Sequence, residues 1–240
     1  MAGLLDSELV IRAATGLLDQ SGNGHNAAEQ NGSVPIVSKP GHNGDLAFSF
    51  DGSSSLTFGN KFDGSAELSV GFWVWQNRQS GLRAPFAKGS YYDTNGSFGC
   101  RYDVGKGRLQ YSIRRQSFIF KQPSLNFASW THVALVHSQD GMQMYLDGDL
   151  VTPTHVSGTY GSVPTSTFDF WIGRETSGRR WVGLIDDFQL SYRPWTSAEI
   201  SRWYSHGRGY DPKIHVDPSS VIQPRAAFGP PLPLCPKNVW

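Results

Sequence analysis

Residues 130–151 read WTHVALVHSQDGMQMYLDGDLV. The first part of this stretch, residues 130–137, alternates as a strand does and ends near Asp140-Gly141. Two further apolar runs flank Asp147-Gly148, and Asp-Gly between apolar runs predicts a tight hairpin, because both residues tolerate the positive φ angles of its turn. The stretch therefore predicts consecutive strands joined by short turns.

The same pattern extends from residue 47 to residue 192. Short segments with a period of two follow one another, with turn residues between them. In residues 68–75 aliphatic and phenylalanine side chains alternate with Trp73 and Trp75, so both faces of this strand are expected to be covered. Regularly spaced short strands predict an all-β fold, a two-sheet antiparallel jelly-roll sandwich.

One short helix is expected after the strands. Thr196 and Glu199 have the spacing of a capping box, in which each side chain accepts a hydrogen bond from the other residue's backbone N–H. Ile200 and Trp203 follow as apolar positions, and Gly207 is a natural end for the helix. We therefore expect one domain over residues 1–207.

Residues 208–240 have a different composition from the rest of the chain. Prolines recur throughout this segment, so extended or polyproline conformation is expected instead of helix or strand. The segment also carries many apolar residues, which a solvated linker seldom does. It therefore predicts an extended Pro-rich arm that binds a partner through Phe228, Leu232, Leu234 and Trp240.

Composition and charge exclude several classes of function. The chain has 21 basic and 20 acidic residues with no block of like charge, which argues against nucleic acid as a partner. No stretch approaches the ~18 consecutive apolar residues of a membrane helix, so membrane insertion is not expected. The first residues lack the basic and apolar regions of a signal peptide. Cys100 and Cys235 make no metal-binding pattern, and free thiols are favoured over a disulfide.

Several short motifs occur in a characteristic order. They are LDQSGNGH at 18–25, FDG at 50–52, LSVGFWV at 68–74, WTHVA at 130–134, MYLDG at 144–148, IGR at 172–174, GLIDDF at 183–188 and TSAEI at 196–200. In this order they resemble the laminin-G-like jelly rolls of the concanavalin A-like lectin and glucanase superfamily, over about residues 8–207. The resemblance implies two curved antiparallel sheets, with ligands bound on the concave face or by rim loops.

The superfamily contains glycosidases, but the catalytic pattern is missing. Retaining glycosidases need two carboxylates about 5–5.5 Å apart, and the laminarinase-like members carry them as Glu-x-Asp-x-x-Glu, which is absent from this sequence. Asp186-Asp187 is expected to point to opposite faces of a strand, with one aspartate ordering a turn or an ion and the other solvated. His132 alternates with apolar positions and is expected to pack in the sheet. The sequence therefore predicts a protein that is not an enzyme.

Calcium is the metal that the resemblance implies. In many relatives an Asp-x-Ser-Gly-Asn-Gly turn approaches a late Asp-Asp pair and holds Ca²⁺ through oxygen atoms, as a hard cation requires. Here Asp19, Asn23 and Asp187 are the corresponding ligands. The alternative is that residues 21–24 form a turn without an ion, and both interpretations stay open.

Ligand binding is expected in loops that combine aromatic and basic residues. Tyr91, Tyr92, Arg115, Arg180 and Trp181 have this character. Aromatic faces stack on pyranose rings and arginine donates to hydroxyls or carboxylates, so these residues predict a sugar platform. The alternative is that they are ordinary residues of a sandwich rim.

The resemblance and the missing export signal together favour a virion surface protein of a tailed phage, either a capsid decoration or cement protein or a tail-surface protein. Such a protein assembles in the host cytoplasm and attaches to capsid or tail subunits partly through residues 208–240. Host-surface glycans and further copies of the chain stay open as additional partners.

Two other classes of function compete with the virion hypothesis. A carbohydrate-binding or adhesion module of a bacterial surface or secreted protein would bind glycans through its rim loops and lie outside the cell or on its surface. Such a module is normally exported, which the first residues of this sequence do not indicate. The third class, a glycosidase, lacks its carboxylate motif.

Overall fold

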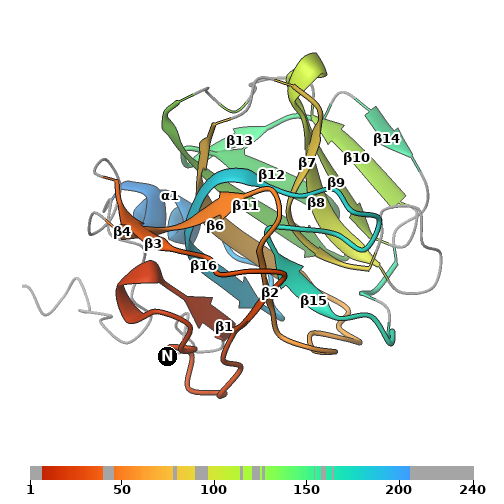
Figure 1. Ribbon diagram of the computed structural model, residues 1–240. Coiled ribbons are helices and arrows are strands. Elements are labelled where there is room, and N and C mark those ends of the chain that lie inside the picture. Colours follow the sequence, from red (N-terminus) through yellow and green to blue (C-terminus); the bar gives the residue numbers. More distant parts are fainter. Residues whose placement is uncertain are drawn as a thin grey trace, which may run out of the picture.

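The computed structural model describes residues 7–39, 46–77, 80–89, 97–113, 116–120, 125, 128–153, 155–157, 161–163 and 165–205. In these residues two eight-stranded sheets, whose strand pairs are all antiparallel, pack face to face as a sandwich with one short helix (Figure 1). The expected all-β jelly-roll sandwich is therefore confirmed. No helix in the described part of the chain is long and apolar enough to span a membrane.

Sheet A contains the strand order β13-β12-β11-β6-β16-β4-β3, and β1 also pairs with β16. Its strands are β1 (Ser7–Ile11), β3 (Ile36–Ser38), β4 (Leu46–Asp51), β6 (Leu68–Gln76), β11 (Trp130–Ser138), β12 (Gly141–Leu146), β13 (Asp149–Val151) and β16 (Val182–Ser191). Its centre is formed by β11, β6 and β16, whose long apolar segments are buried.

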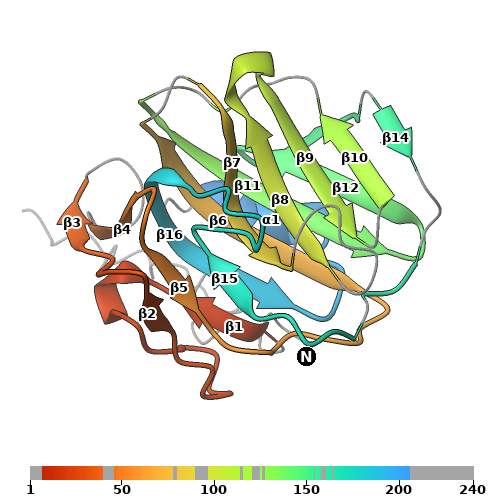
Figure 2. The same cartoon turned by 45° about the vertical axis from the view of Figure 1, so that its right-hand side comes forward.

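Sheet B has the strand order β14-β10-β9-β8-β7-β15-β5-β2, and Figure 2 shows it lying across sheet A. Its strands are β2 (Ala28–Gln30), β5 (Ser55–Thr57), β7 (Leu82–Lys88), β8 (Phe98–Asp103), β9 (Arg108–Ile113), β10 (Gln116–Phe120), β14 (His155–Ser157) and β15 (Phe170–Ile172). The described residues also contain two 3₁₀ turns, η2 (Ala13–Thr15) and η4 (Val104–Lys106), and one helix.

The Asp-Gly hairpin forms as the sequence predicts. Leu146 pairs with Asp149 across the turn, and Asp147 and Gly148 have φ angles of 50° and 85°. The Asp147 carboxylate also accepts a hydrogen bond of 2.8 Å from the backbone N–H of His132. The turn is thereby fixed to the neighbouring strand, which sets the register of β12 against β11.

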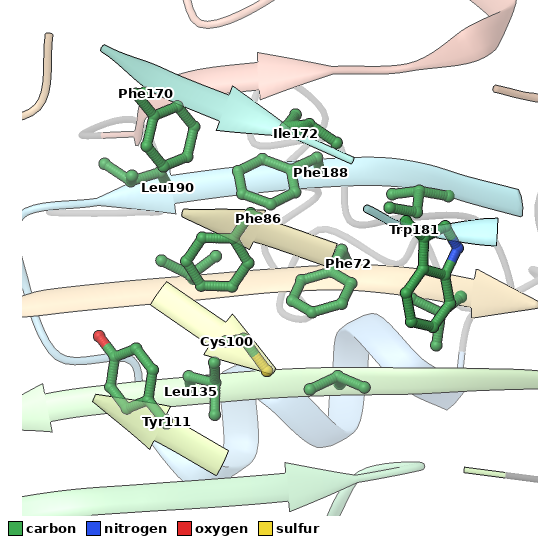
Figure 3. Close-up of a cluster of buried hydrophobic side chains, with 14 of the residues drawn as sticks. Phe72, Phe86, Cys100, Tyr111, Leu135, Phe170, Ile172, Trp181, Phe188 and Leu190 are labelled. Carbon is green, nitrogen blue, oxygen red and sulfur yellow. The ribbon is translucent and has the colours of Figure 1, made fainter. Parts of the chain in front are cut away.

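Aromatic rings from both sheets fill the space between them (Figure 3). Phe72 of β6 and Phe188 of β16 stack with centroids 5.7 Å apart, and both contact Phe86 of β7 from the opposite sheet. Phe170 of β15 joins the same cluster. Because large rings lose the most water-exposed area on burial, this cluster contributes heavily to the association of the two sheets. Cys100 is a free, buried thiol in the same core.

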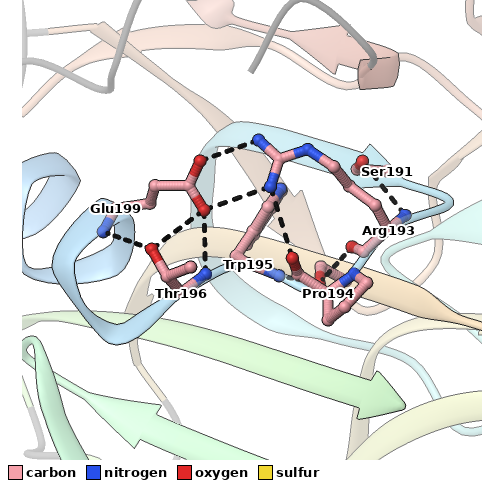
Figure 4. A network of polar contacts seen from close by, with 7 residues as sticks. Ser191, Arg193, Pro194, Trp195, Thr196 and Glu199 are labelled. Atoms are coloured by element: carbon pink, nitrogen blue, oxygen red, sulfur yellow. Dashed lines mark hydrogen bonds and ion pairs between the residues drawn. The ribbon is translucent and has the colours of Figure 1, made fainter. Parts of the chain in front are cut away.

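Helix α1 (Ser197–Ser205) begins with the predicted capping box. The backbone N–H of Glu199 donates to Thr196 Oγ1 at 3.2 Å, and the backbone N–H of Thr196 donates to Glu199 Oε2 at 2.8 Å (Figure 4). Arg193 donates to both carboxylate oxygens of Glu199 and thus ties the cap to the preceding turn.

The helix covers part of the outer face of sheet A. Its Ile200 and Trp203, together with Trp195, form a second apolar cluster with side chains of β11 and β12. Gly71 on β6 lies directly below: a Cβ atom at this position would be 2.2 Å from Trp203 Cζ3. Trp73 also lies on this face and is buried, whereas Trp75 is partly exposed.

Candidate ligand-binding site

A hairpin of residues 173–181 connects β15 to β16 and folds over the outer face of sheet B. Arg174 and Arg180 form an antiparallel bridge in it, and the backbone N–H of Thr176 donates to the carbonyl of Gly89 after β7. Only glycine fits at position 173, where φ is 91° and a Cβ atom would be 2.4 Å from Phe50 Cδ1. The hairpin is therefore held in place at its base and at its tip.

Glu175 in this hairpin forms a buried ion pair with Arg101 of β8. Arg101 Nε donates to Oε2 at 2.6 Å and Nη2 donates to Oε1 at 2.8 Å, and the two residues are 2% and 1% exposed. Arg179 Nη1 donates to Oε1 at 2.7 Å, and Ser177 Oγ also donates to Oε1. Three of these donors bind Oε1 and one binds Oε2, so the carboxylate makes four hydrogen bonds within the protein. Glu175 is thus a structural anchor of the hairpin.

A partly open hollow lies beside this ion pair. Its lining includes Ala87, Gly99, Ser112, Arg101 and Glu175. The first three pair with one another across β7, β8 and β9, so small side chains form a row directly below the hollow. The enclosed space is about 10 Å³, which is room for about one water molecule. The hollow is therefore too small to enclose a ligand, and a ligand could only lie over it on the surface of the sheet.

Of the five residues predicted for the sugar platform, the structure describes Arg180 and Trp181. Arg180 lies on the hairpin and donates from Nη1 to the carbonyl of Ser53. Trp181 is 0% exposed, so its prediction as a stacking surface is wrong. It follows Arg180 at the point where the hairpin enters the core, and its Nε1 donates to the carbonyl of Leu184. The remaining predicted residues lie outside the described part of the chain: Tyr91, Tyr92 and Arg115 of the platform, and Phe228, Leu232, Leu234 and Trp240 of the arm.

The predicted calcium ligands have partners within the protein. Asp19 accepts hydrogen bonds from the backbone of Val10, Ser21 and His25, and Asn23 Nδ2 donates to the carbonyls of Ser7 and Glu8. In the residues described, no group of three or more His, Cys, Asp or Glu side chains could hold a metal ion.

Asp187, the third predicted calcium ligand, forms an ion pair with Arg12 at 2.9 Å. A guanidinium therefore already supplies positive charge beside this carboxylate. Calcium binding at Asp19, Asn23 and Asp187 stays a prediction, which a chelator that lowers the melting temperature would support.

The Asp186-Asp187 pair differs from the expectation that one of the two is solvated. Both are buried, because the pairing of β16 with β6 is irregular between Asp186 and Gln189 and Asp187 has a φ of 48°. Asp186 Oδ1 accepts a hydrogen bond of 2.6 Å from the backbone N–H of Ala13. Burial and the charge of Asp187 raise the pKa of Asp186 to about 8. The pair thus binds the N-terminal segment to sheet A.

Sequence reasoning missed the Arg101–Glu175 pair. Arg101 lies between the core positions Cys100 and Tyr102 in the sequence. If the outer face of this strand is covered, an arginine there needs a buried partner, and this is the one sequence feature that points to the ion pair. The sequence around Glu175 offers no comparable signal, since its partner is 74 residues away in the chain.

Comparison with known proteins gives a family match. Residues 28–201 match the model of the family Laminin_G_3, described as the concanavalin A-like lectin/glucanases superfamily. A search of curated protein sequences gives no match.

Solved structures of similar fold include domain 4 of AbnA, a GH43 extracellular arabinanase from Geobacillus stearothermophilus, in complex with arabinotriose. Its TM-score is 0.63 at 18% identity, over 82% of this chain and 98% of that chain. The receptor binding domain of botulinum neurotoxin D has a TM-score of 0.59 at 18% identity, over 84% of this chain and 53% of that chain.

The binding domain of Paraclostridial Mosquitocidal Protein 1 has a TM-score of 0.64 at 14% identity, over 84% of this chain and 52% of that chain. The chain thus spans about half the length of these two toxin domains. At these identities the likeness establishes a shared fold.

Proposed function

The chain belongs to the concanavalin A-like lectin/glucanases superfamily, and from this premise we propose that it is a non-catalytic carbohydrate-binding module. The observation that carries the proposal is the hollow on the outer face of sheet B. Its lining combines the small-residue row Ala87, Gly99 and Ser112 with the fixed polar pair Arg101 and Glu175. A saccharide can approach the backbone closely over small residues, and the buried polar pair holds the edge of this surface in place.

Rigidity of the polar edge favours binding. Arg101 and Glu175 hold each other, and the hairpin is attached to β7 and to the core. Groups that are already ordered lose little conformational freedom when a ligand binds, so less of the interaction energy is spent on ordering them. A neutral ligand such as a sugar benefits from this because each of its hydrogen bonds is individually weak.

The same contacts argue against hydrolysis at this site. Among the described residues that line the hollow, Glu175 is the one carboxylate, and its oxygens are occupied by Arg101, Arg179 and Ser177. Glycoside hydrolysis by the usual mechanisms needs two carboxyl groups on either side of the scissile bond. Asp186 and Asp187 are buried beside the N-terminal segment with partners of their own.

Similar folds in other proteins support a binding role. Domain 4 of AbnA was solved with arabinotriose, and two further similar structures are toxin binding domains. From domain 4 of AbnA we extend to this chain only the class of ligand, a saccharide.

The proposal is tested with a glycan array followed by calorimetry on the saccharides retained. We expect the protein to bind a subset of saccharides, and Ser112→Leu to weaken that binding at least tenfold, because leucine fills the hollow. Thr152→Leu adds a similar side chain at an exposed position next to β13 and serves as the matched control. Melting temperatures verify that both variants fold. A folded wild-type protein that binds no saccharide at high concentration would refute the proposal.

Attachment to a virus particle through residues 208–240 stays a prediction from the sequence, as does the virion location. The segment lies outside the described residues. Deleting residues 208–240 and measuring incorporation into particles tests this hypothesis, and full incorporation of the shortened protein would contradict it.

A further inference from the structure

The hairpin of residues 173–181 carries more positive than negative charge. Its ionisable residues are three arginines and Glu175, and Glu175 already binds Arg101 and Arg179 on the side that faces β8. Arg174 and Arg180 are opposite each other in the antiparallel bridge. Since neighbouring residues in a strand point to opposite sides, these two arginines lie on the other side of the hairpin from Glu175. Neither forms an ion pair with a residue in the described ranges.

Arg174 is held against an aromatic ring. Its Cζ lies 5.0 Å from the ring centroid of Trp171 on β15, and the Trp171 indole is fixed by a hydrogen bond of 2.8 Å from Nε1 to Gln30 Oε1. Arg174 Nε donates weakly, at 3.4 Å, to the carbonyl of Glu175. A guanidinium that stacks on an indole keeps its in-plane N–H donors available at its edge. The terminal Nη donors of Arg174 have no carboxylate partner in the described part of the protein.

Arg180 is held by the turn that follows β4. Its Nη1 donates to the carbonyl of Ser53. Asp51 lies in the same turn, but its carboxylate accepts hydrogen bonds from Ser53 and Ser54. These bonds hold the pKa of Asp51 well below its usual range. The Asp51 carboxylate therefore binds within its own turn. Arg180 is positioned by the neutral carbonyl of Ser53.

Two guanidinium groups fixed opposite each other repel. Burial and the nearby charge of Arg180 lower the pKa of Arg174. Like charges directly opposite each other in a strand pair are unfavourable. An anion between them would remove this repulsion and accept hydrogen bonds from both side chains, and paired arginine donors match the geometry of a carboxylate or sulfate.

We propose that Arg174 and Arg180, next to Trp171, form an anion-binding site that gives this module a preference for acidic saccharides. The ligand class is an oligosaccharide that carries carboxylate or sulfate groups. The proposal rests on the proposed carbohydrate binding, because the same hairpin borders the hollow through Glu175. The two arginines lie on the other side of the hairpin from the hollow, so an oligosaccharide that contacts both must extend across the hairpin.

The test uses an array of sialylated, uronate-containing and sulfated oligosaccharides, each beside its neutral counterpart with the acidic group esterified or removed. Calorimetry at 150 mM salt then measures the affinity for the best acidic and neutral pair. We expect the acidic member to bind at least tenfold more tightly. Arg174→Gln and Arg180→Gln should each weaken acidic binding about tenfold, and neutral binding less than twofold, because each removes charge-assisted hydrogen bonds.

Two further variants separate specific contacts from general charge. Lys106→Gln removes one positive charge from an exposed lysine in η4, and we expect it to leave the affinities unchanged. Arg174→Lys keeps the charge but loses the planar donor pair, so its acidic affinity should lie between those of the wild type and Arg174→Gln. Melting temperatures confirm that each variant is folded.

Each outcome separates this proposal from the proposed function. Equal binding of acidic and neutral saccharides, unaffected by Arg174→Gln and Arg180→Gln, would overturn the anion site and leave carbohydrate binding intact. Binding of no saccharide would overturn both. Binding of polyglutamate as tightly as the best acidic saccharide, with the same dependence on the two arginines, would overturn the assignment of a saccharide as the ligand.

Discussion

The Arg101 guanidinium of β8 and the Glu175 carboxylate of the 173–181 hairpin form a two-bond ion pair that is almost completely buried. This pair positions the hairpin over sheet B and forms the polar edge of the hollow. The hairpin in turn holds Arg174 and Arg180 beside Trp171. Stability and the proposed binding are therefore linked through one buried contact.

Glu175→Leu should lower the free energy of unfolding by about 3–5 kcal/mol, because it leaves the Arg101 charge buried without its partner. The double variant Arg101→Leu with Glu175→Leu should recover most of this loss, since it removes both charges. Urea denaturation of the wild type, the single variants and the double variant measures the effect. A loss below about 1 kcal/mol for Glu175→Leu would contradict the buried pairing.

Gly71→Ala should destabilise the protein by about 1–3 kcal/mol through overpacking under helix α1. The added Cβ would be 2.2 Å from Trp203 Cζ3 and 2.8 Å from Trp195 Cζ3. Gly105→Ala is the control, because its Cβ would meet only Asp103 Oδ1, at 3.8 Å. Equal melting temperatures for the two variants would show that α1 does not pack against β6.

His132 should make stability fall on acidification. It is 0% exposed and packs between Trp73 and Trp203, and burial lowers its pKa to about 3. The unfolded chain binds a proton near pH 6.5, whereas the folded protein does not. The contribution of neutral His132 to the free energy of unfolding is therefore fully present above pH 6.5. It declines as pH falls from 6.5 towards 3, by at most about 1.4 kcal/mol per pH unit.

Replacing His132 by leucine isolates this contribution. His137 stays in both proteins, and its pKa is also lowered by burial, so it leaves a residual slope of the same sign. We expect the difference in unfolding free energy between wild type and His132→Leu to change between pH 6.5 and pH 4. A difference that is constant over this range would indicate that His132 is protonated in the folded protein.

Asp186 should have the opposite effect at higher pH. Its folded pKa is raised to about 8, so the folded protein keeps a proton that the unfolded chain loses near pH 4. The contribution of Asp186 to stability is therefore present below pH 4 and is lost as pH rises from 4 to 8. Asp186→Asn, which cannot ionise, should gain stability relative to the wild type over this range in chemical denaturation.

Asp187→Asn is the control for Asp186→Asn, because it makes the same substitution at the neighbouring aspartate. It breaks the ion pair with Arg12 and should lower stability at neutral pH. If the stability difference between Asp186→Asn and the wild type is instead constant from pH 4 to pH 8, Asp186 is already ionised in the folded state over this range.

Local features of the fold could be predicted from the sequence because the residues involved are close together in the chain. The Asp147-Gly148 turn depends on the φ angles of two consecutive residues, and the Thr196–Glu199 cap joins residues three apart. Period-two alternation marks strands because side chains of a strand alternate between its faces. The all-β sandwich and its helix could therefore be predicted.

The tertiary structure decided which polar groups are buried and which partners they have. Arg101 binds Glu175 from 74 residues away, and Asp186 accepts from Ala13 across 173 residues. Trp181 enters the core and Arg180 stays at the surface, although the two are adjacent in a stretch that predicted a platform. A buried charge is stable only with a suitable partner, and that partner is set by how the two sheets and the hairpin come together. The sequence by itself therefore determined the strands, the Asp-Gly turn and the helix cap, whereas only the packing of distant segments decided the hollow on sheet B and the charged residues beside it.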